Sequence, residues 1–312
     1  MKPQGPSPIL VFAALIAVQI LFGLNYVLSK VVVDVFPPLV WASARIIIST
    51  VIMLSIAFLS GTDSPKPDRH FLIPLVAFSL LGIIINQASF LVGLHYTTST
   101  NSAILNTLIP VVTLLIVTLR GQEPVTTKRV LGFISAFAGV LVIRRVEDFS
   151  LSNSTLIGDL LTIVNCISYG FFLAYSKPFF QKNNRLWTTA WMFLYGSVGL
   201  TLLAAPQWVS FQMPALTPVL IGCMIFGVLG ATVLTYFLNF WALAYARSSS
   251  VALFIYLQPI VAAALAWFWF NEPPTVRTFL SCGLIFFGVL LGLSREAANP
   301  AAQEQAIPVK IT

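Results

Sequence analysis

Charged residues are scarce in this 312-residue chain: Asp, Glu, Lys and Arg make up 9% of it, whereas 58% of the residues are hydrophobic. A soluble domain carries about 25% charged residues, and so few charges cannot cover a water-facing surface of this size. The low charge therefore excludes a soluble globular enzyme, and the high apolar content excludes a disordered chain. The mean hydropathy of +0.91 indicates a multi-pass membrane protein.

Residues for metal, disulfide and catalytic chemistry are few as well. The three cysteines, Cys166, Cys223 and Cys282, lie inside apolar segments without CxxC spacing, and the two histidines have no partner at metal-ligand spacing. We expect no disulfide framework, metal site or cofactor. The sequence contains no Ser-His-Asp set, HExxH sequence or phosphate-binding loop, so no motif indicates an enzyme. The net charge of +7 comes without a basic cluster interleaved with aromatic residues, so we expect no nucleic-acid partner.

Long apolar segments fill most of the chain. A bilayer core about 30 Å thick needs ~20 residues of α-helix to cross it. We predict an all-α membrane protein with ten transmembrane helices, at residues 8–29, 38–59, 71–93, 99–119, 128–144, 157–177, 187–205, 217–243, 248–270 and 276–294.

Basic residues are distributed unequally between the two sides of this arrangement. With a cytoplasmic N-terminus, twelve Lys and Arg residues fall on the cytoplasmic side, four fall on the other side and Arg45 lies within a span, which accounts for all 17. Cytoplasmic loops are enriched in Lys and Arg, so we expect both termini in the cytoplasm. The first apolar run is too long for a cleaved signal peptide. Residues 295–312 are polar and predict a flexible cytoplasmic tail.

The second half of the chain repeats the first at a shift of 149 residues. The matched residues are Tyr96 and Tyr245, Ser99 and Ser248, Pro110 and Pro259, and Glu123-Pro124 and Glu272-Pro273. These matches indicate a duplication with units at 8–146 and 157–294. Each unit holds five predicted helices, an odd number, so the second unit enters the membrane from the opposite side. Such inverted-topology repeats place a substrate site near the bilayer midplane, between the units.

Several of these residues resemble the EamA family of the drug/metabolite transporter superfamily. The resemblance covers about residues 8–294 and rests on Leu21-Phe-Gly-Leu-Asn25, Ser29-Lys30, Arg45, Tyr96, Ser99, Pro110 and Gly121-Gln-Glu123-Pro124, with Tyr245, Ser248, Pro259 and Glu272 as the second copy. It implies a multi-pass protein of a bacterial inner membrane that exports amino acids or related small metabolites. From the two inverted units we expect alternating access as the mechanism, and we expect the protein to act in the lipid bilayer as a monomer or homodimer.

Charged groups inside the predicted spans limit the cargo. None of the ten Asp and Glu residues lies in the middle of a span. Proton-coupled export of a cation typically uses a buried carboxylate, so cationic drugs are disfavoured. Asp159 is the nearest candidate, and an acid at a helix N-terminus is the simpler interpretation of it. One arginine is too little for cargo with several phosphates. Arg45 either contacts a substrate carboxylate, extends to the interface or bonds backbone carbonyls.

Neutral polar residues recur on one face of several predicted helices. The candidate substrate-binding residues are Asn86, Gln87, Asn106, Asn165, Tyr169, Thr235, Tyr236, Asn239, Tyr256 and Gln258, together with Arg45. Any one of these side chains could instead join two helices by a hydrogen bond. Taken together, they favour a wet central cavity for a small-molecule substrate.

Two other classes of protein remain as alternatives. An integral membrane enzyme would need convergent catalytic groups near the membrane interface, and the few charged residues form no such set. A non-transporting sensor or assembly factor would need neither the duplication nor the polar stripes. The sequence therefore favours a transporter.

Overall fold

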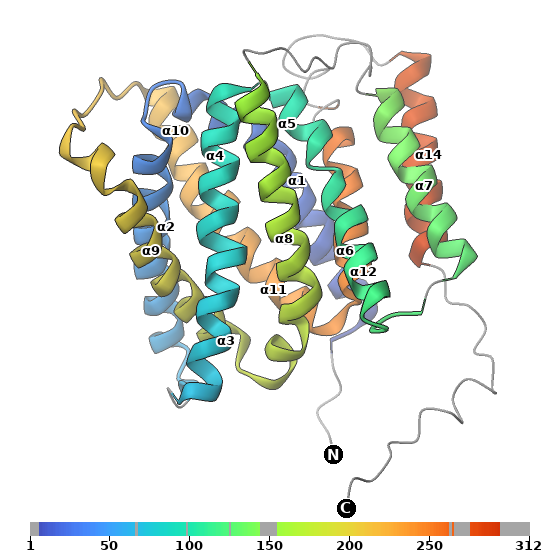
Figure 1. Cartoon of the computed structure of the whole chain (residues 1–312), viewed down its shortest axis with the longest axis horizontal. Coiled ribbons are helices and arrows are strands. Elements are labelled where there is room, and N and C mark those ends of the chain that lie inside the picture. Colours follow the sequence, from blue (N-terminus) through green and yellow to red (C-terminus); the bar gives the residue numbers. More distant parts are fainter. Residues whose placement is uncertain are drawn as a thin grey trace, which may run out of the picture.

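The computed structural model describes residues 6–65, 68–97, 99–124, 126–143, 155–261, 264 and 275–293, apart from the side chains of 99–101. Within these ranges every regular element is a helix and no strand occurs. The long helices run between two ends of a bundle, and α1 (Pro8–Val33) begins at the end where α14 (Val276–Leu293) finishes (Figure 1). We call this the N-terminal end of the bundle, and the other the far end.

In the described part of the chain, eight helices are long and apolar enough to cross a membrane. They span Pro8–Val33, Pro38–Leu59, Arg69–Tyr96, Ser102–Leu119, Leu156–Lys182, Arg185–Val209, Pro218–Tyr245 and Val276–Leu293. Two shorter helices, Thr127–Ile143 and Ser248–Val261, lie where the fifth and ninth spans were predicted. Residues 262–263 and 265–270 of the predicted ninth span lie outside the described part of the chain. The expectation of an all-helical membrane protein is thus confirmed.

Several helices extend beyond the predicted apolar segments. Where the sequence predicted a helix over 157–177, α8 (Leu156–Lys182) continues through Pro178, and α9 (Arg185–Val209) continues through Pro206. The helix α2 (Pro38–Leu59) matches its prediction. The prediction ended the sixth helix at Lys177, where the uncharged segment ends, but a helix can extend past the bilayer core into the interface.

Two of the long helices are interrupted by π-helical segments. In the first, η1 (Leu80–Ile85) joins α3 (Arg69–Ser79) to α4 (Asn86–Tyr96). In the second, η3 (Phe226–Leu234) joins α10 (Pro218–Ile225) to α11 (Thr235–Tyr245).

Two threonine hydroxyls, one in η3 and one directly after it, match the wider turns of η3. Thr232 Oγ1 donates to the Gly227 carbonyl and Thr235 Oγ1 to the Gly230 carbonyl, each at 2.6 Å and five residues back. The backbone hydrogen bonds of a π-helix also join residues five apart, and such segments are frequent at functional sites.

Two further helices break just before a proline. After α5 (Ser99–Leu105) the chain turns at Asn106 and Thr107 and resumes as α6 (Leu108–Leu119), with Pro110 in its first turn. Similarly, α12 (Ser248–Leu253) passes into the 3₁₀ segment η4 (Phe254–Leu257) just before Pro259. Proline lacks an N–H and its ring clashes with the carbonyl four residues earlier, which disfavours a continuous α-helix at both sites.

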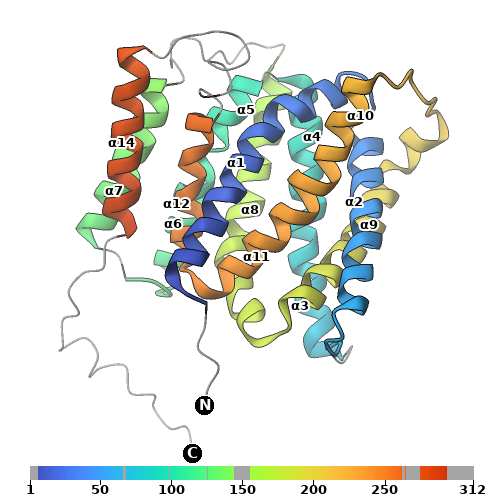
Figure 2. The same ribbon diagram turned by 180° about the vertical axis from the view of Figure 1, so that it is seen from behind.

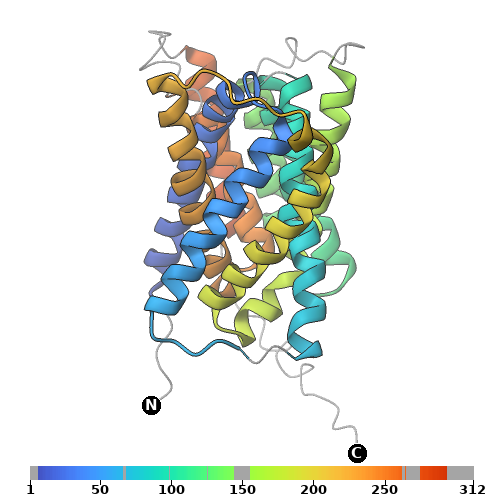
Figure 3. The ribbon, with the colours of Figure 1, turned by 90° about the vertical axis from the view of Figure 1, so that its left-hand side faces the viewer.

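Helices from the two halves of the chain pack in pairs. Extensive contacts join α2 to α9, α1 to α11, α4 to α8 and α6 to α12. Figure 2 shows α1 beside α11, and Figure 3 shows α2 and α9 on one side of the bundle. The pair α7 (Thr127–Ile143) and α14 lies at the opposite side (Figure 1). A Cβ atom on Gly288 of α14 would lie 2.5 Å from the Ala136 nitrogen, so these two backbones touch.

Candidate functional site

A small cavity lies inside the bundle, between α1, α2, α4, α8 and the two helices that break before Pro110 and Pro259. Its lining residues are Phe22, Asn25, Tyr26, Arg45, Asn86, Gln87, Phe90, Asn106, Ile109, Asn165, Tyr169, Ala231, Ile255 and Gln258. The cavity has a volume of about 60 Å³. A cavity needs at least about 10–15 Å³ to hold one water molecule, so this space has room for water. The cavity is therefore small and partly polar.

A chain of hydrogen bonds starts at Arg45, which α2 places at the cavity. Its Nη2 donates to Gln87 Oε1, and Gln87 Nε2 donates to the Tyr236 hydroxyl. That hydroxyl donates to Asn86 Oδ1 at 3.0 Å. Arginine can only donate hydrogen bonds, so it fixes the orientation of the Gln87 amide and of each group after it.

The series of hydrogen bonds continues from α4 across α8 to the turn between α5 and α6. Asn86 Nδ2 donates to Asn165 Oδ1 at 2.5 Å, and Asn165 Nδ2 donates to Asn106 Oδ1 at 2.7 Å. Asn106 Nδ2 then donates to the Ser102 carbonyl at 2.8 Å. The break before Pro110 places Asn106 in a turn between two helices, where its amide can meet α8. All these amides are buried, and their mutual bonds offset the cost of removing them from water.

Further hydrogen bonds tie other cavity residues to their neighbours. The Tyr26 hydroxyl donates to Gln258 Oε1 at 3.0 Å, and Gln258 Nε2 donates to Gln19 Oε1 at 2.8 Å. On α8, the Tyr169 hydroxyl accepts from Asn239 Nδ2 at 2.6 Å. These bonds join α1 to the segment after η4, and α8 to α11.

The guanidinium of Arg45 has no carboxylate partner among the residues that the structure describes. The residue is 1% exposed, and its Nε and Nη1 atoms have no hydrogen-bond partner among the described residues. Its Cζ atom lies 6.0 Å from the centroid of the Trp41 ring, at the outer limit of a cation–π contact. Only Glu123 and Asp159 are buried acids in the described part of the chain, and neither lines the cavity.

The structure brings together most of the residues that the sequence singled out. The cavity is lined by Arg45, Asn86, Gln87, Asn106, Asn165, Tyr169 and Gln258. Two more, Tyr236 and Asn239, lie just behind the lining and bond to it. The alternatives in which Arg45 extends to the interface or caps backbone carbonyls do not hold, because its bond is to the Gln87 side chain.

Two predicted residues lie away from the cavity. Thr235 bonds to the Gly230 carbonyl of its own helix. The Tyr256 ring packs against Phe133 and Phe137 of α7, with ring centroids 6.3 and 6.4 Å apart. The π-helical segment before Thr235 and the 3₁₀ segment around Tyr256 change the direction of these side chains relative to a regular α-helix. Neither residue lines the cavity, and a role of either in substrate binding stays a prediction.

Some lining residues were not among the predicted site residues. On α1, Phe22, Asn25 and Tyr26 all face the cavity. Asn25 also accepts a hydrogen bond from Ser29 at 2.7 Å. Their spacing of three and four residues marks one helix face, and this is the signal that identifies them.

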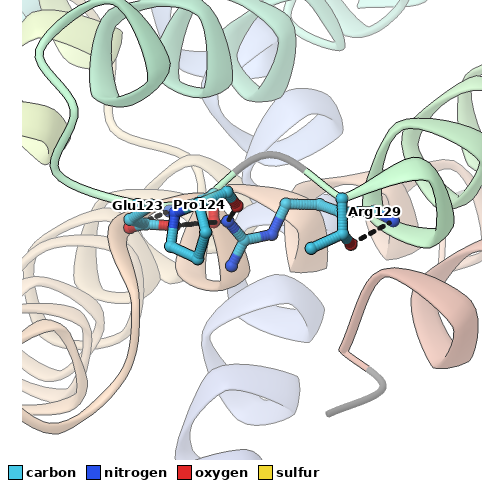
Figure 4. A network of polar contacts seen from close by, with 5 residues as sticks. Glu123, Pro124 and Arg129 are labelled. Atoms are coloured by element: carbon cyan, nitrogen blue, oxygen red, sulfur yellow. Dashed lines mark hydrogen bonds and ion pairs between the residues drawn. The ribbon is translucent and has the colours of Figure 1, made fainter. Parts of the chain in front are cut away.

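A buried ion pair in the first half of the chain is hydrogen-bonded to the second half at the N-terminal end. Arg129 Nη1 lies 3.2 Å from Glu123 Oε2 and also donates to the Pro124 carbonyl at 2.8 Å (Figure 4). The backbone N–H of Ser249, in α12, donates to Glu123 Oε1 at 3.3 Å, and its hydroxyl donates to Oε2. The loop after α6 is thereby clamped to the start of α12.

The far end of the bundle is tightly closed between α4 and α8. A Cβ atom on Gly158 would lie 2.7 Å from both the Gly93 carbonyl oxygen and the Thr97 nitrogen. Asp159 Oδ1 accepts a hydrogen bond from the Thr97 hydroxyl at 2.7 Å. Lys30 Nζ, at the end of α1, donates to the Leu94 carbonyl at 3.0 Å. These contacts leave no room between the helices.

The N-terminal end is more open. A pocket of about 580 Å³ lies between α3 and the last turns of α8, with Phe71, Phe78 and Phe179 in its wall. Another of about 370 Å³ lies beside the start of α1 and the end of α11. Phe78 and Phe179 pack edge to face with ring centroids 5.5 Å apart. The ends of the bundle thus differ in how closely their helices pack.

These features define a multi-pass helical membrane protein with a buried polar cavity. The model of the EamA-like transporter family matches the chain twice, at residues 9–145 and 156–294. The chain therefore belongs to the EamA-like transporter family, within the drug/metabolite transporter superfamily, and is a membrane transporter by family.

Relatives in a bacterium, an archaeon and a plant match between about three quarters and nearly all of the chain. An uncharacterized transporter of Bacillus subtilis (strain 168), YoaV, is 22% identical over 288 residues, which cover 90% of this chain and 96% of YoaV. An uncharacterized transporter of Archaeoglobus fulgidus is 26% identical over 234 residues, 74% of this chain and 79% of the relative. Protein WALLS ARE THIN 1 of Arabidopsis thaliana is 23% identical over 346 residues, 97% of this chain and 88% of its own.

A solved crystal structure, described only as that of a protein, has the same fold. It superimposes with a TM-score of 0.73 at 13% sequence identity, and covers 96% of this chain and 98% of its own.

Proposed function

We propose that this protein exports a small metabolite, such as an amino acid, across a bacterial inner membrane by alternating access. The observation that carries the proposal is the central cavity, in which polar side chains from both halves of the chain meet inside apolar helices. Buried polar groups are costly in a membrane and mark substrate pathways. Membership of a transporter family supports the same conclusion.

We propose ten transmembrane helices in two inverted repeats, at residues 8–146 and 157–294, with 295–312 as a cytoplasmic tail. The π-helical segments support the repeat, because η1 ends at Ile85 and η3 at Leu234, 149 residues later. Gln87 bonds to its own repeat mate, Tyr236, at the same separation. Two residues that occupy the same position in the two repeats can touch only where both lie close to the axis that relates the repeats. The bond between Gln87 and Tyr236 therefore supports a pseudo-two-fold axis at the cavity.

The proposed substrate-binding residues are Arg45 and the amide and phenol groups of the lining. They are Asn86, Gln87, Asn106, Asn165, Tyr169 and Gln258. Tyr236 and Asn239 position them through the bonds to Gln87 and Tyr169. The described residues offer no group of three metal ligands, and the proposal needs no cofactor.

The unequal ends of the bundle support alternating access. The far end is closed by direct contact of α4 and α8, whereas pockets remain at the N-terminal end. With the N-terminus in the cytoplasm, this corresponds to a state closed to the outside. Opening the far end and closing the N-terminal end would expose the cavity to the other side of the membrane.

Counterflow in proteoliposomes tests the proposed function. Vesicles with purified protein are loaded with unlabelled amino acids or small carboxylates and diluted into the labelled compound. We expect transient accumulation of label with the wild type and a loss of at least tenfold with Asn106→Leu. The matched control is Gly283→Ala, since a Cβ atom there meets nothing within 4 Å. Absence of counterflow for every compound tested would contradict transport and favour a sensor or assembly factor.

A further inference from the structure

Arg45 is the feature of the cavity that the protein's own contacts leave incomplete. The residue is 1% exposed. Among the described residues, its Nη2 atom donates a hydrogen bond to Gln87 Oε1. Nε and Nη1 have no partner in the described part of the chain. A buried charge is expensive unless it is paired and hydrogen-bonded. Within the described part of the chain, Arg45 therefore lacks an anionic partner.

Every described element around Arg45 presents a neutral group to it. On its own helix lies Trp41, with the Arg45 Cζ atom 6.0 Å from the ring centroid. From α4 comes the Gln87 amide, and from α11 the Tyr236 hydroxyl that Gln87 meets. In η3, Gly227 approaches the arginine stem, with its Cβ position 3.7 Å from Arg45 Cδ.

The buried acids of the described chain are engaged elsewhere. Glu123 is bonded to Arg129 and Ser249 at the N-terminal end. Asp159 accepts from Thr97 at the far end. Neither lines the cavity, so neither neutralises Arg45.

The rest of the lining is suited to an uncharged body. Phe22 and Phe90 contribute rings, and Ile109, Ala231 and Ile255 contribute aliphatic surface. The polar part consists of amides and phenols, which bind neutral donors and acceptors but carry no charge. One full positive charge therefore faces an otherwise neutral cavity.

We propose that the cargo carries one net negative charge, in a carboxylate that Arg45 binds, and that the rest of the cargo is uncharged. This inference rests on the proposed function and narrows its substrate class, from amino acids and related metabolites to metabolites with one carboxylate and no ammonium group. A zwitterion would bring an ammonium group into a site that already holds an unpaired cation. A dianion would have one cation for two charges, and a cation would repel Arg45.

Matched compounds that differ only in charge test this proposal. The short series is butanoate, 2-aminobutanoate and butylamine, and the aromatic series is 3-phenylpropanoate, phenylalanine and 2-phenylethylamine. Binding to the purified protein is measured by the shift of the melting temperature with concentration. We expect the monocarboxylate of at least one series to bind tenfold or more tightly than its zwitterion, and the amines not to bind. Equal binding of zwitterion and monocarboxylate in both series, or no binding in either, would overturn the proposal.

Two variants test whether the positive charge of Arg45 causes the preference for a monocarboxylate. Arg45→Gln removes the cation and should abolish the preference for the monocarboxylate. Gln87→Glu supplies a carboxylate from within the protein, and should raise the melting temperature while abolishing monocarboxylate binding. Because Gln87→Glu is expected to stabilise the fold, it keeps the test informative if Arg45→Gln fails to fold. Preserved monocarboxylate binding in folded Gln87→Glu protein would overturn the proposal.

Counterflow separates a failure of this inference from a failure of the proposed function. If the wild type exchanges zwitterions as readily as monocarboxylates, transport stands and the charge assignment is wrong. If monocarboxylates bind with the predicted dependence on Arg45 but no compound is exchanged, the charge assignment stands and transport is wrong.

Discussion

The contact of α4 with α8 at the far end makes a quantitative prediction for Gly158→Ala. The new methyl group would lie 2.7 Å from the Gly93 carbonyl oxygen and from the Thr97 nitrogen, and both are backbone atoms. Backbone atoms cannot rotate away as a side chain does, so the helices must separate. Overpacking of this kind costs about 1–3 kcal/mol, and it is paid only in the closed state. The ratio of open to closed protein should therefore rise about 5- to 150-fold.

Distances between spin labels measure this shift. Labels on Tyr96→Cys and Leu156→Cys report the separation of α4 and α8, since these residues are 50% and 40% exposed near the far end. In the wild-type background we expect one short distance, and with Gly158→Ala a second, longer population. Gly283→Ala, where a Cβ atom meets nothing within 4 Å, should leave the distribution unchanged.

A second control separates gating from general destabilisation. Gly288→Ala also overpacks a helix contact, because its Cβ atom would lie 2.5 Å from the Ala136 nitrogen. That contact joins α7 to α14, away from the far-end closure between α4 and α8. We expect a lower melting temperature and an unchanged distance distribution. If Gly158→Ala leaves the α4–α8 distance unchanged in folded protein, the reasoning that this contact closes the far end is refuted.

Three further predictions concern the topology, the cavity, and the clamp that Glu123 forms with Arg129 and Ser249. A C-terminal fusion to a reporter that fluoresces only in the cytoplasm should be bright, since the basic residues place both termini there; a dark fusion would contradict the orientation. Asn86→Cys should react with a small water-soluble thiol reagent and be protected by cargo, whereas Tyr256→Cys should react at least tenfold more slowly, because Tyr256 packs against α7; equal rates would contradict this placement. Glu123→Gln should destabilise the protein by about 3–5 kcal/mol by leaving Arg129 without its buried partner, and an unchanged melting temperature in detergent would show that the clamp contributes little.

The sequence alone was sufficient to predict the helical membrane fold. Apolar run length and sparse charge are properties of single segments, and they respond directly to the thickness of the bilayer. The amides that line the cavity were also accessible, because Asn86, Asn106 and Asn165 are polar residues in the middle of apolar helices. A polar group there needs a partner, so its presence indicates a polar interior.

Side-chain direction in the irregular segments could not be predicted in the same way. Thr235 was assigned to the cavity from a regular 3.6-residue period, but η3 has wider turns and Thr235 bonds to its own helix. Tyr256 lies in the tighter 3₁₀ segment η4 and packs against α7. The pairing of Arg45 with Gln87, and of Glu123 with Ser249, depends on how distant helices pack. No local pattern contains that information.

The central claim, that one cavity is exposed alternately to the two sides of the membrane, is tested most directly at Ile109, which lines the cavity and is 6% exposed. Ile109→Cys, with the three native cysteines replaced, is reconstituted in vesicles, and a membrane-impermeant thiol reagent is added to one side at a time. We predict reaction from both sides, faster from the side of the N-terminus, with Gly158→Ala increasing the rate from the other side and cargo slowing both. Reaction from one side only, unchanged by Gly158→Ala and by cargo, would contradict the account.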